Sequence, residues 1–267
     1  MSEKRERIRG FIEPGSEIAG GVAGAAVGLI TGGPAGALAG AALGPAIASV
    51  IERTCLEIYD RASGYRQRVR GGAAAAYALV AIEDRIRQGD SIRDDGFFDS
   101  TVARSSADEV LEGVILKSRN ENEEKKVRYY SNIFVTAAFD PHFTPAALNH
   151  ALQIAEQLTY RQLCLLRLFS RPQPITLRGS NYFPDVTKDR MGWETLAVLA
   201  ESFDLCRMDL IGCYPSDDSK AVMFLSALHD LIPSKMSRTA FGDRLHYLMQ
   251  LESISQEDVE RVALYLK

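Results

Sequence analysis

The sequence contains few of the residues that most often form catalytic or metal sites. Four histidines, four cysteines and one tryptophan occur among 267 residues. The local signatures of zinc peptidases (His-Glu-x-x-His), serine hydrolases (Gly-x-Ser-x-Gly) and P-loop nucleotide-binding proteins are absent. We therefore expect the protein not to be an enzyme and to have no cofactor and no metal site. An enzyme whose site is assembled from dispersed residues is kept as an alternative.

The cysteines form no Cys-x-x-Cys pair. They are scattered along the chain, as Cys55, Cys164, Cys206 and Cys213. Isolated cysteines in a sequence of cytosolic character are typical of buried, reduced thiols. We therefore expect no disulfide framework.

Neither sign of charge dominates. The chain has 31 Lys and Arg against 35 Asp and Glu, a net charge of −4, and 46% hydrophobic residues. Proteins that bind nucleic acid usually carry a basic surface, so nucleic acid is not expected as a partner. Glu13 and Glu17 precede the first apolar run, which is too long for a cleaved export signal. We expect a cytoplasmic protein with the composition of a folded chain.

One segment departs from this average. Residues 18–51 carry no charge and contain 9 of the 21 glycines. Within this segment glycine recurs at every fourth position: Gly20, Gly24, Gly28, Gly32, Gly36, Gly40 and Gly44. Each glycine costs an isolated helix about 1 kcal/mol relative to alanine. Close contact with a second backbone, which small residues four apart allow, can offset that cost. The pattern resembles the glycine zipper of membrane-inserting and channel-forming proteins.

The length of this segment predicts a hairpin. One straight helix over 34 residues would be about 51 Å long, against about 30 Å for the hydrocarbon core of a bilayer. Gly32, Gly33 and Pro34 form a strong turn signal, which divides the segment into helices over 18–31 and 35–51. Pro45 lies inside the second helix and should kink it.

Basic residues flank the hairpin on both sides. Lys4, Arg5, Arg7 and Arg9 precede it, and Arg53, Arg61, Arg66, Arg68 and Arg70 follow it. This distribution favours insertion with both ends in the cytoplasm, at the inner membrane of a bacterium. Each arm is shorter than the roughly 20 residues that usually span a bilayer, so we expect a homo-oligomer to stabilise insertion. The alternative is a water-soluble hairpin packed in an alanine-rich core.

The rest of the chain has helical periodicity. Ser106 to Glu109 form a capping box that predicts one long helix reaching Ala138, with a solvated charged face stabilised by pairs such as Glu121–Lys125. A loop over 90–105 precedes it. Further helices are predicted over 52–63, 73–89, 145–157, 159–169, 193–205, 243–251 and 256–266.

Isolated polar residues in this body form no recognisable site. His142 and His150 could face each other across a turn, but lone imidazoles are more often surface residues. Tyr160, Arg161 and Arg167 lie close together on one predicted helix. We assign none of these residues a catalytic role.

The C-terminal part resembles a winged-helix arrangement. Leu158–Leu163 looks like a first winged-helix helix, Trp193–Leu205 a second, and 231–242 is similar to the strand–LTxxG–helix end of that family. Winged helices bind DNA or protein, and the missing basic face favours a protein partner. The chain also resembles bacterial proteins of unassigned activity with a glycine-rich start and a central Leu-Thr-Tyr-Arg-Gln-Leu-Cys-Leu-Leu sequence.

We expect a mainly α protein in three parts. These are a glycine-zipper hairpin with a flanking helix (1–64), a helical domain (65–158) and a winged-helix-like domain (159–267). The leading functional hypothesis is a membrane-associated bacterial effector whose hairpin inserts or self-associates, in a toxin-like role or in defence against phage. The first alternative is a soluble adaptor or regulator that binds protein or DNA, and the second is the enzyme with a dispersed site.

Overall fold

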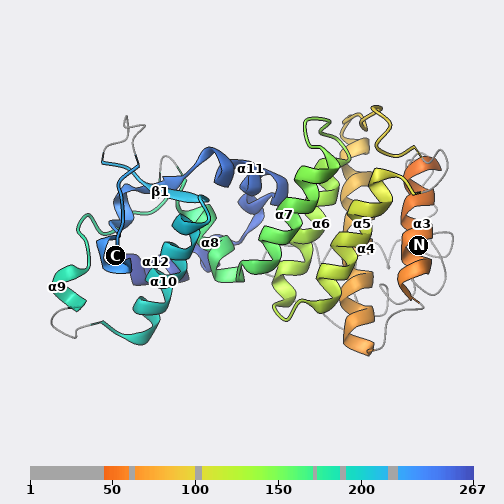
Figure 1. Cartoon of the computed structure of the whole chain (residues 1–267). Coiled ribbons are helices and arrows are strands. Elements are labelled where there is room, and N and C mark those ends of the chain that lie inside the picture. The colour runs from red at the N-terminus through yellow and green to blue at the C-terminus, as the bar shows by residue number, and fades with distance from the viewer. Residues whose placement is uncertain (1–44, 60–63, 100–103, 171–172, 187–190, 216–221) are drawn as a thin grey trace. The chain divides into compact units, whose positions relative to one another are not determined.

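The computed structural model describes residues 45–59, 64–99, 104–170, 173–186, 191–215 and 222–267, which are mainly helical (Figure 1). The chain divides into two compact units. The first comprises Met1–Gln157 with Leu248–Gln250, and the second Leu158–Tyr247 with Leu251–Lys267. The part of the predicted hairpin that precedes residue 45 lies outside the described residues.

The first unit is a group of packed helices. Its elements are α3 (Pro45–Tyr59), α4 (Tyr65–Arg87), α5 (Ser106–Asn120), η1 (Glu124–Lys126), α6 (Val127–Ala137) and α7 (Pro145–Gln157). Figure 1 shows α4, α5, α6 and α7 side by side, and α4 packs against both α5 and α6. Every residue of α4 from Gly71 to Val80 is buried. This explains why the Gly-Gly-Ala-Ala-Ala-Ala sequence of α4 forms a stable helix despite its glycines.

Small residues in α4 allow a close approach of α5. A Cβ atom added to Gly71 would lie 2.8 Å from Cγ of Arg119 and 3.2 Å from Cγ2 of Ile115. Because real Cβ atoms need more space, a larger residue would push the two helices apart.

The predicted continuous helix over 106–138 is wrong. It is interrupted between α5 and α6 by the short 3-10 helix η1. Lys126 and Arg128 are buried rather than solvated. Nζ of Lys126 lies 2.6 Å from Oε2 of Glu121, so Glu121 forms an ion pair with a buried lysine. Burial of this pair requires the bend, because an uninterrupted helix would keep the charges on its solvent face.

The capping box of α5 is shifted by one residue from its predicted position. Ser105, rather than Ser106, is the N-cap, and Asp108 takes the place predicted for Glu109. Oγ of Ser105 accepts a hydrogen bond from N of Asp108 at 3.1 Å. The Asp108 carboxylate accepts one from N of Ser105 at 2.8 Å. Two consecutive serines followed by two acidic residues make both registers compatible with the sequence rule.

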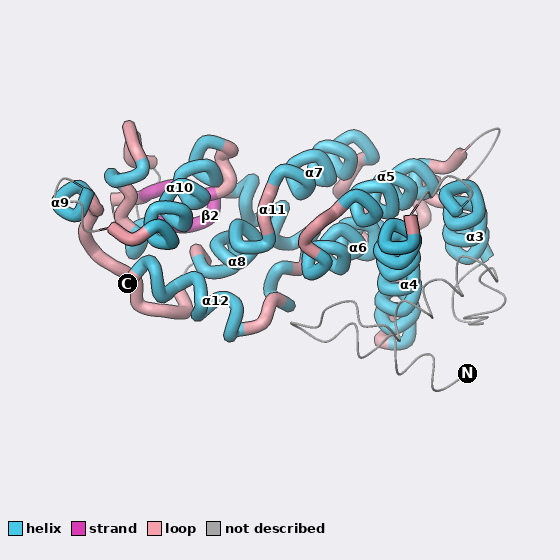
Figure 2. The backbone as a smooth tube through the Cα atoms, turned by 90° about the horizontal axis from the view of Figure 1, so that it is seen from below, coloured by secondary structure: helices cyan, strands magenta, loops and turns pink. Residues whose placement is uncertain are grey.

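The second unit combines short helices with a two-stranded sheet. Its helices are α8 (Tyr160–Leu168), α9 (Phe183–Val186), α10 (Trp193–Arg207), η2 (Leu228–Asp230), η3 (Pro233–Lys235), α11 (Ala240–Met249), η4 (Leu251–Ser253), α12 (Gln256–Ala263) and η5 (Leu264–Leu266). Strand β1 (Ile211–Cys213) pairs antiparallel with β2 (Met236–Arg238), with Gly212 opposite Ser237. This sheet lies against α10 (Figure 2). The helices predicted over 159–169, 193–205 and 256–266 are confirmed.

The junction between β2 and α11 explains the glycine of the LTxxG-like segment. Oγ1 of Thr239 accepts a hydrogen bond from N of Gly242 at 3.0 Å, and N of Thr239 donates to O of Leu210 at 3.2 Å. A Cβ atom on Gly242 would lie only 1.8 Å from that same Leu210 oxygen. The backbone of α11 therefore touches the backbone that leads into β1.

Candidate functional site

The structure does not describe the residues predicted to form the glycine-zipper hairpin. These are the glycines at every fourth position from Gly20 to Gly44 and the turn at Gly32, Gly33 and Pro34. The first described element after them is α3, which starts at Pro45. The candidate site can therefore be described from the element that follows the glycine-rich segment.

One face of α3 packs into the first unit. Ile47, Val50, Ile51 and Thr54 are buried, with the i, i+3, i+4, i+7 spacing of a helix face. This face lies against α5 and α4. The end of the uncharged segment 18–51 is thus part of the protein's own hydrophobic core.

Asp108 joins α3 to α5. The Asp108 side chain is fully buried. Its carboxylate accepts hydrogen bonds from Nε of Arg53 at 3.1 Å and from Oγ of Ser105 at 2.7 Å. Nη2 of Arg53 also donates to it. Thr54 also donates from Oγ1 at 3.4 Å. Burial alone would raise the pKa of Asp108, but the hydrogen bonds from Arg53 and Ser105 outweigh it and hold the pKa below its ordinary value. Asp108 is therefore an ionised carboxylate that ties α3 to the start of α5.

Three of the arginines that follow the glycine series form ion pairs within the first unit. Nη1 of Arg66 lies 3.0 Å from Oε1 of Glu124, and Nε of Arg70 lies 3.7 Å from the same oxygen. Nη1 of Arg70 also donates to the carbonyl oxygen of Glu121. Together with Arg53, these residues anchor the segment that follows the glycine series to α5 and η1.

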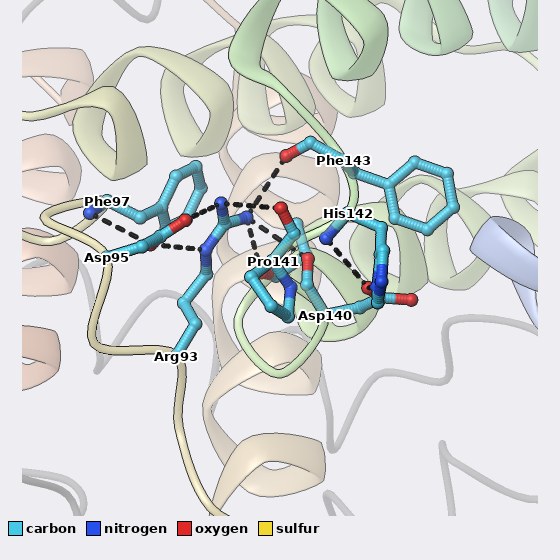
Figure 3. A network of polar contacts seen from close by, with 8 residues as sticks. Arg93, Asp95, Phe97, Asp140, Pro141, His142 and Phe143 are labelled. Carbon is cyan, nitrogen blue, oxygen red and sulfur yellow. Dashed lines mark hydrogen bonds and ion pairs between the residues drawn. The ribbon is translucent and has the colours of Figure 1, made fainter.

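Figure 3 shows Arg93, in the loop after α4, whose side chain is 4% exposed. Nη1 of Arg93 donates to the carbonyl oxygens of Ala137, Asp140 and Phe143 at 3.2, 3.2 and 3.1 Å. The guanidinium lies 4.4 Å from the centre of the Phe97 ring. Arg93 thus binds carbonyl groups of the last residue of α6 and of the loop that follows it, so the network has a structural role.

The residues considered as isolated polar candidates are used to hold the fold together. Nδ1 of the exposed His142 lies 2.8 Å from Asp140, and His150 is exposed on α7. In the second unit, the Tyr160 hydroxyl donates to Asp258 at 2.9 Å, Arg161 pairs with Glu201 and Glu194 at 2.6 and 2.9 Å, and Arg167 donates to the carbonyl of Ile254. The contacts of Tyr160, Arg161 and Arg167 each tie one element of the second unit to another.

Two features of the described residues were missed by sequence reasoning. The Arg53–Asp108 pair joins positions 55 residues apart, and its only sequence clue was the acidic capping residue. The second feature is a group of sulfur atoms from Cys206, Cys213 and Met223, which have no motif spacing. Within the described part of the chain, no three or more His, Cys, Asp or Glu side chains gather in a way that could hold a metal ion.

None of the helices described by the structure is both long and apolar enough to cross a membrane. Comparison of the chain with protein-family models, with curated proteins and with solved structures found no match.

Proposed function

We propose that the protein is a membrane-associated bacterial effector in which the glycine series from Gly20 to Gly44 forms a self-associating glycine-zipper hairpin. The observation that carries this proposal is the unbroken series of seven glycines, four residues apart, from Gly20 to Gly44. Such a series in an uncharged segment favours close packing of helix backbones where water is scarce. The function is an interaction with lipid and with other copies of the chain, without catalysis.

The first unit acts as the holder of the hairpin. Its α3 continues directly from the glycine series and is bound to α5 through its buried apolar face and the Arg53–Asp108 pair. A firmly attached α3 transmits any movement of the hairpin to the helical body. Toxin-like permeabilisation of the inner membrane, in defence against phage, is the most concrete form of this proposal.

The test is substitution within the glycine series. Gly24→Leu combined with Gly40→Leu fills the groove on both arms, and we expect the full chain to lose its membrane fraction and its toxicity in cells. The matched control is Ala26→Leu combined with Ala42→Leu, which places the same leucine side chain about 200° away around each helix. Helical content and melting temperature of the body should stay unchanged in both variants. Equal membrane fraction and toxicity in wild type and in Gly24→Leu/Gly40→Leu would contradict the proposal.

A second candidate function is an adaptor or regulator that binds through a winged-helix-like second unit. The observation that favours it is the antiparallel pair β1–β2 leading directly into α11, together with two large exposed apolar side chains on this unit. Trp193 is 79% exposed and Phe224 92% exposed. Exposed aromatic residues are enriched at protein-binding surfaces. Loss of a captured protein partner on Trp193→Ala, with membrane association unchanged, would support this function, and salt-dependent DNA binding by the full chain would assign it to nucleic acid.

A further inference from the structure

The second unit contains a pocket of about 230 Å³ beside the two-stranded sheet. It lies between the last turns of α10, strand β1 and residues 222–225. Its lining includes Phe203, Cys206, Cys213, Val222, Met223 and Phe224. Apolar side chains therefore surround three sulfur-containing residues.

The segment carrying Met223 is held against β1 by a backbone hydrogen bond. N of Met223 donates to O of Cys213 at 2.6 Å. The same two residues bring their sulfur atoms together, because Sγ of Cys213 lies 3.8 Å from Sδ of Met223. Cys206, from the last turn of α10, lines the same pocket.

We propose that Cys206, Cys213 and Met223 form a binding site for one Cu(I) ion, held by two thiolates and one thioether. Soft sulfur ligands select Cu(I) among biological metal ions. Three sulfurs, each about 2.3 Å from a metal in their common plane, would lie about 4.0 Å apart, which is close to the 3.8 Å between Cys213 and Met223. Binding releases the two thiol protons to solvent and leaves the oxidation state of the metal unchanged.

The ligand set favours Cu(I) over Zn²⁺. Structural Zn²⁺ sites use four nitrogen or sulfur ligands in a tetrahedron, normally from Cys and His. Within the residues described, the pocket supplies two thiols, and its third sulfur is a thioether, which is a ligand typical of Cu(I). Phe203, Val222 and Phe224 add apolar side chains to the lining of the same pocket.

The electrostatics of the pocket keep the two thiols protonated in the absence of metal. Burial and, to a smaller extent, the nearby Cys213 together raise the pKa of Cys206 to about 12. Burial also raises the pKa of Cys213, although a backbone hydrogen bond from Ile232 and the charge of Lys235 act in the opposite direction. A bound cation removes this penalty, because a coordinating thiol is deprotonated by the metal.

The test is anaerobic titration of the reduced full chain with Cu(I), in competition with the chromophoric chelator bathocuproine disulfonate. We expect one Cu(I) per chain, and X-ray absorption of the complex should show three sulfur ligands. Cys213→Ser should abolish this binding. Met223→Leu keeps the size and apolarity of the side chain. It should weaken the affinity for Cu(I) at least about 10-fold, because loss of a residue that only hydrogen-bonds to a metal ligand already has an effect of this size.

Matched controls separate this site from other sulfur atoms of the chain. Cys164→Ala, in α8, and Met191→Leu should leave the affinity and the ligand number unchanged. Three results would overturn the proposal. The first is failure of the wild type to compete with the chelator for Cu(I). The second is undiminished Cu(I) binding in Cys213→Ser and Met223→Leu, and the third is a preference of the site for Zn²⁺ over Cu(I). None of these outcomes depends on whether residues 18–51 associate with a membrane.

Discussion

At the scale of single residues, the protein places charged side chains in its interior and satisfies them there. Asp108 has no exposed surface, and the Lys126 side chain is 3% exposed, yet each contacts a partner of opposite charge. Removing one member of such a pair lowers the free energy of unfolding by more than the intact pair contributes to it, because the remaining charge or hydrogen-bonding group stays desolvated. These residues are therefore where single substitutions should have the clearest effect.

Asp108→Asn should loosen the attachment of α3 to α5. The substitution keeps the shape of the side chain but removes the charge that Arg53 pairs with and one acceptor of the capping box. We expect a loss of about 1–3 kcal/mol in the free energy of unfolding of the first unit, limited by the partial exposure of Arg53. Urea unfolding followed by circular dichroism measures it. The exposed Asp94→Asn is the control, and an equal midpoint for both variants would contradict the assigned role of Asp108.

Gly242→Ala should destabilise the second unit strongly. The added Cβ atom would need the space 1.8 Å from O of Leu210, so the backbone of α11 must move away from the residues leading into β1. Overpacking of this kind costs about 1–3 kcal/mol, and contact with a rigid backbone puts this site at the upper end. Gly179→Ala, whose added Cβ would meet only Oγ of Ser234 at 3.7 Å, should leave the melting temperature nearly unchanged. A similar shift in the two variants would show that the approach to Leu210 is not required.

His246 should make the second unit sensitive to acid. Burial, followed by the charge of Arg238, lowers the pKa of His246 to about 4 from an ordinary value of 6.5, although Glu252 and Asp243 act in the opposite direction. The folded state therefore binds fewer protons than the unfolded state below pH 6.5. The free energy of unfolding is therefore undiminished by His246 above that pH, and it falls as the pH decreases towards 4, because the unfolded state gains a proton that the folded state does not bind.

The measurement is the free energy of unfolding of wild type and His246→Gln between pH 7 and pH 5. The wild type should lose about 1–2 kcal/mol more than the variant over this interval. His142→Gln, at an exposed position, should follow the wild type. Parallel pH curves for wild type and His246→Gln would contradict the buried, neutral imidazole.

At the scale of elements, the sequence rules succeeded where one helix carries its own signals. The helices around α8, α10 and α12 were predicted because capping residues and apolar periodicity lie within each segment; Thr159 and Ser255, for example, cap α8 and α12 as N-caps. The helix over 106–138 failed for the opposite reason. Local sequence rules predict that the charged middle of this segment faces solvent. The burial of Lys126 against Glu121 depends on the surrounding helices, which those rules do not consider.

The candidate sites show the same division at the element scale. The glycine series is local and is visible in the sequence alone. The Arg53–Asp108 pair and the approach of Cys206 to Cys213 and Met223 depend on how α3, α10 and β1 pack, and no spacing rule encodes that packing. The glycines of α4 add a related lesson, because Gly71 serves close contact with α5 inside the first unit. Small residues in this chain thus have a role in packing that needs no membrane.

At the scale of the whole molecule, the chain combines two compact units with an uncharged N-terminal segment that ends inside α3. The central claim is that the part of this segment that carries the glycine series, Gly20 to Gly44, packs backbone against backbone within a lipid bilayer, while α3 keeps it attached to the first unit. The balance of acidic and basic residues, with a net charge of −4, gives no reason to expect recruitment of the whole chain to anionic lipid by charge alone. Membrane association should therefore depend on the glycine-rich segment.

Carbonate extraction of membranes from cells that contain the full-length protein tests this claim most directly. Alkaline carbonate releases proteins held at the surface and leaves inserted helices in the pellet. The account predicts that the wild-type chain stays in the pellet and that Gly24→Leu/Gly40→Leu is released. Complete release of the wild type, as a stable monomer in the supernatant, would contradict it.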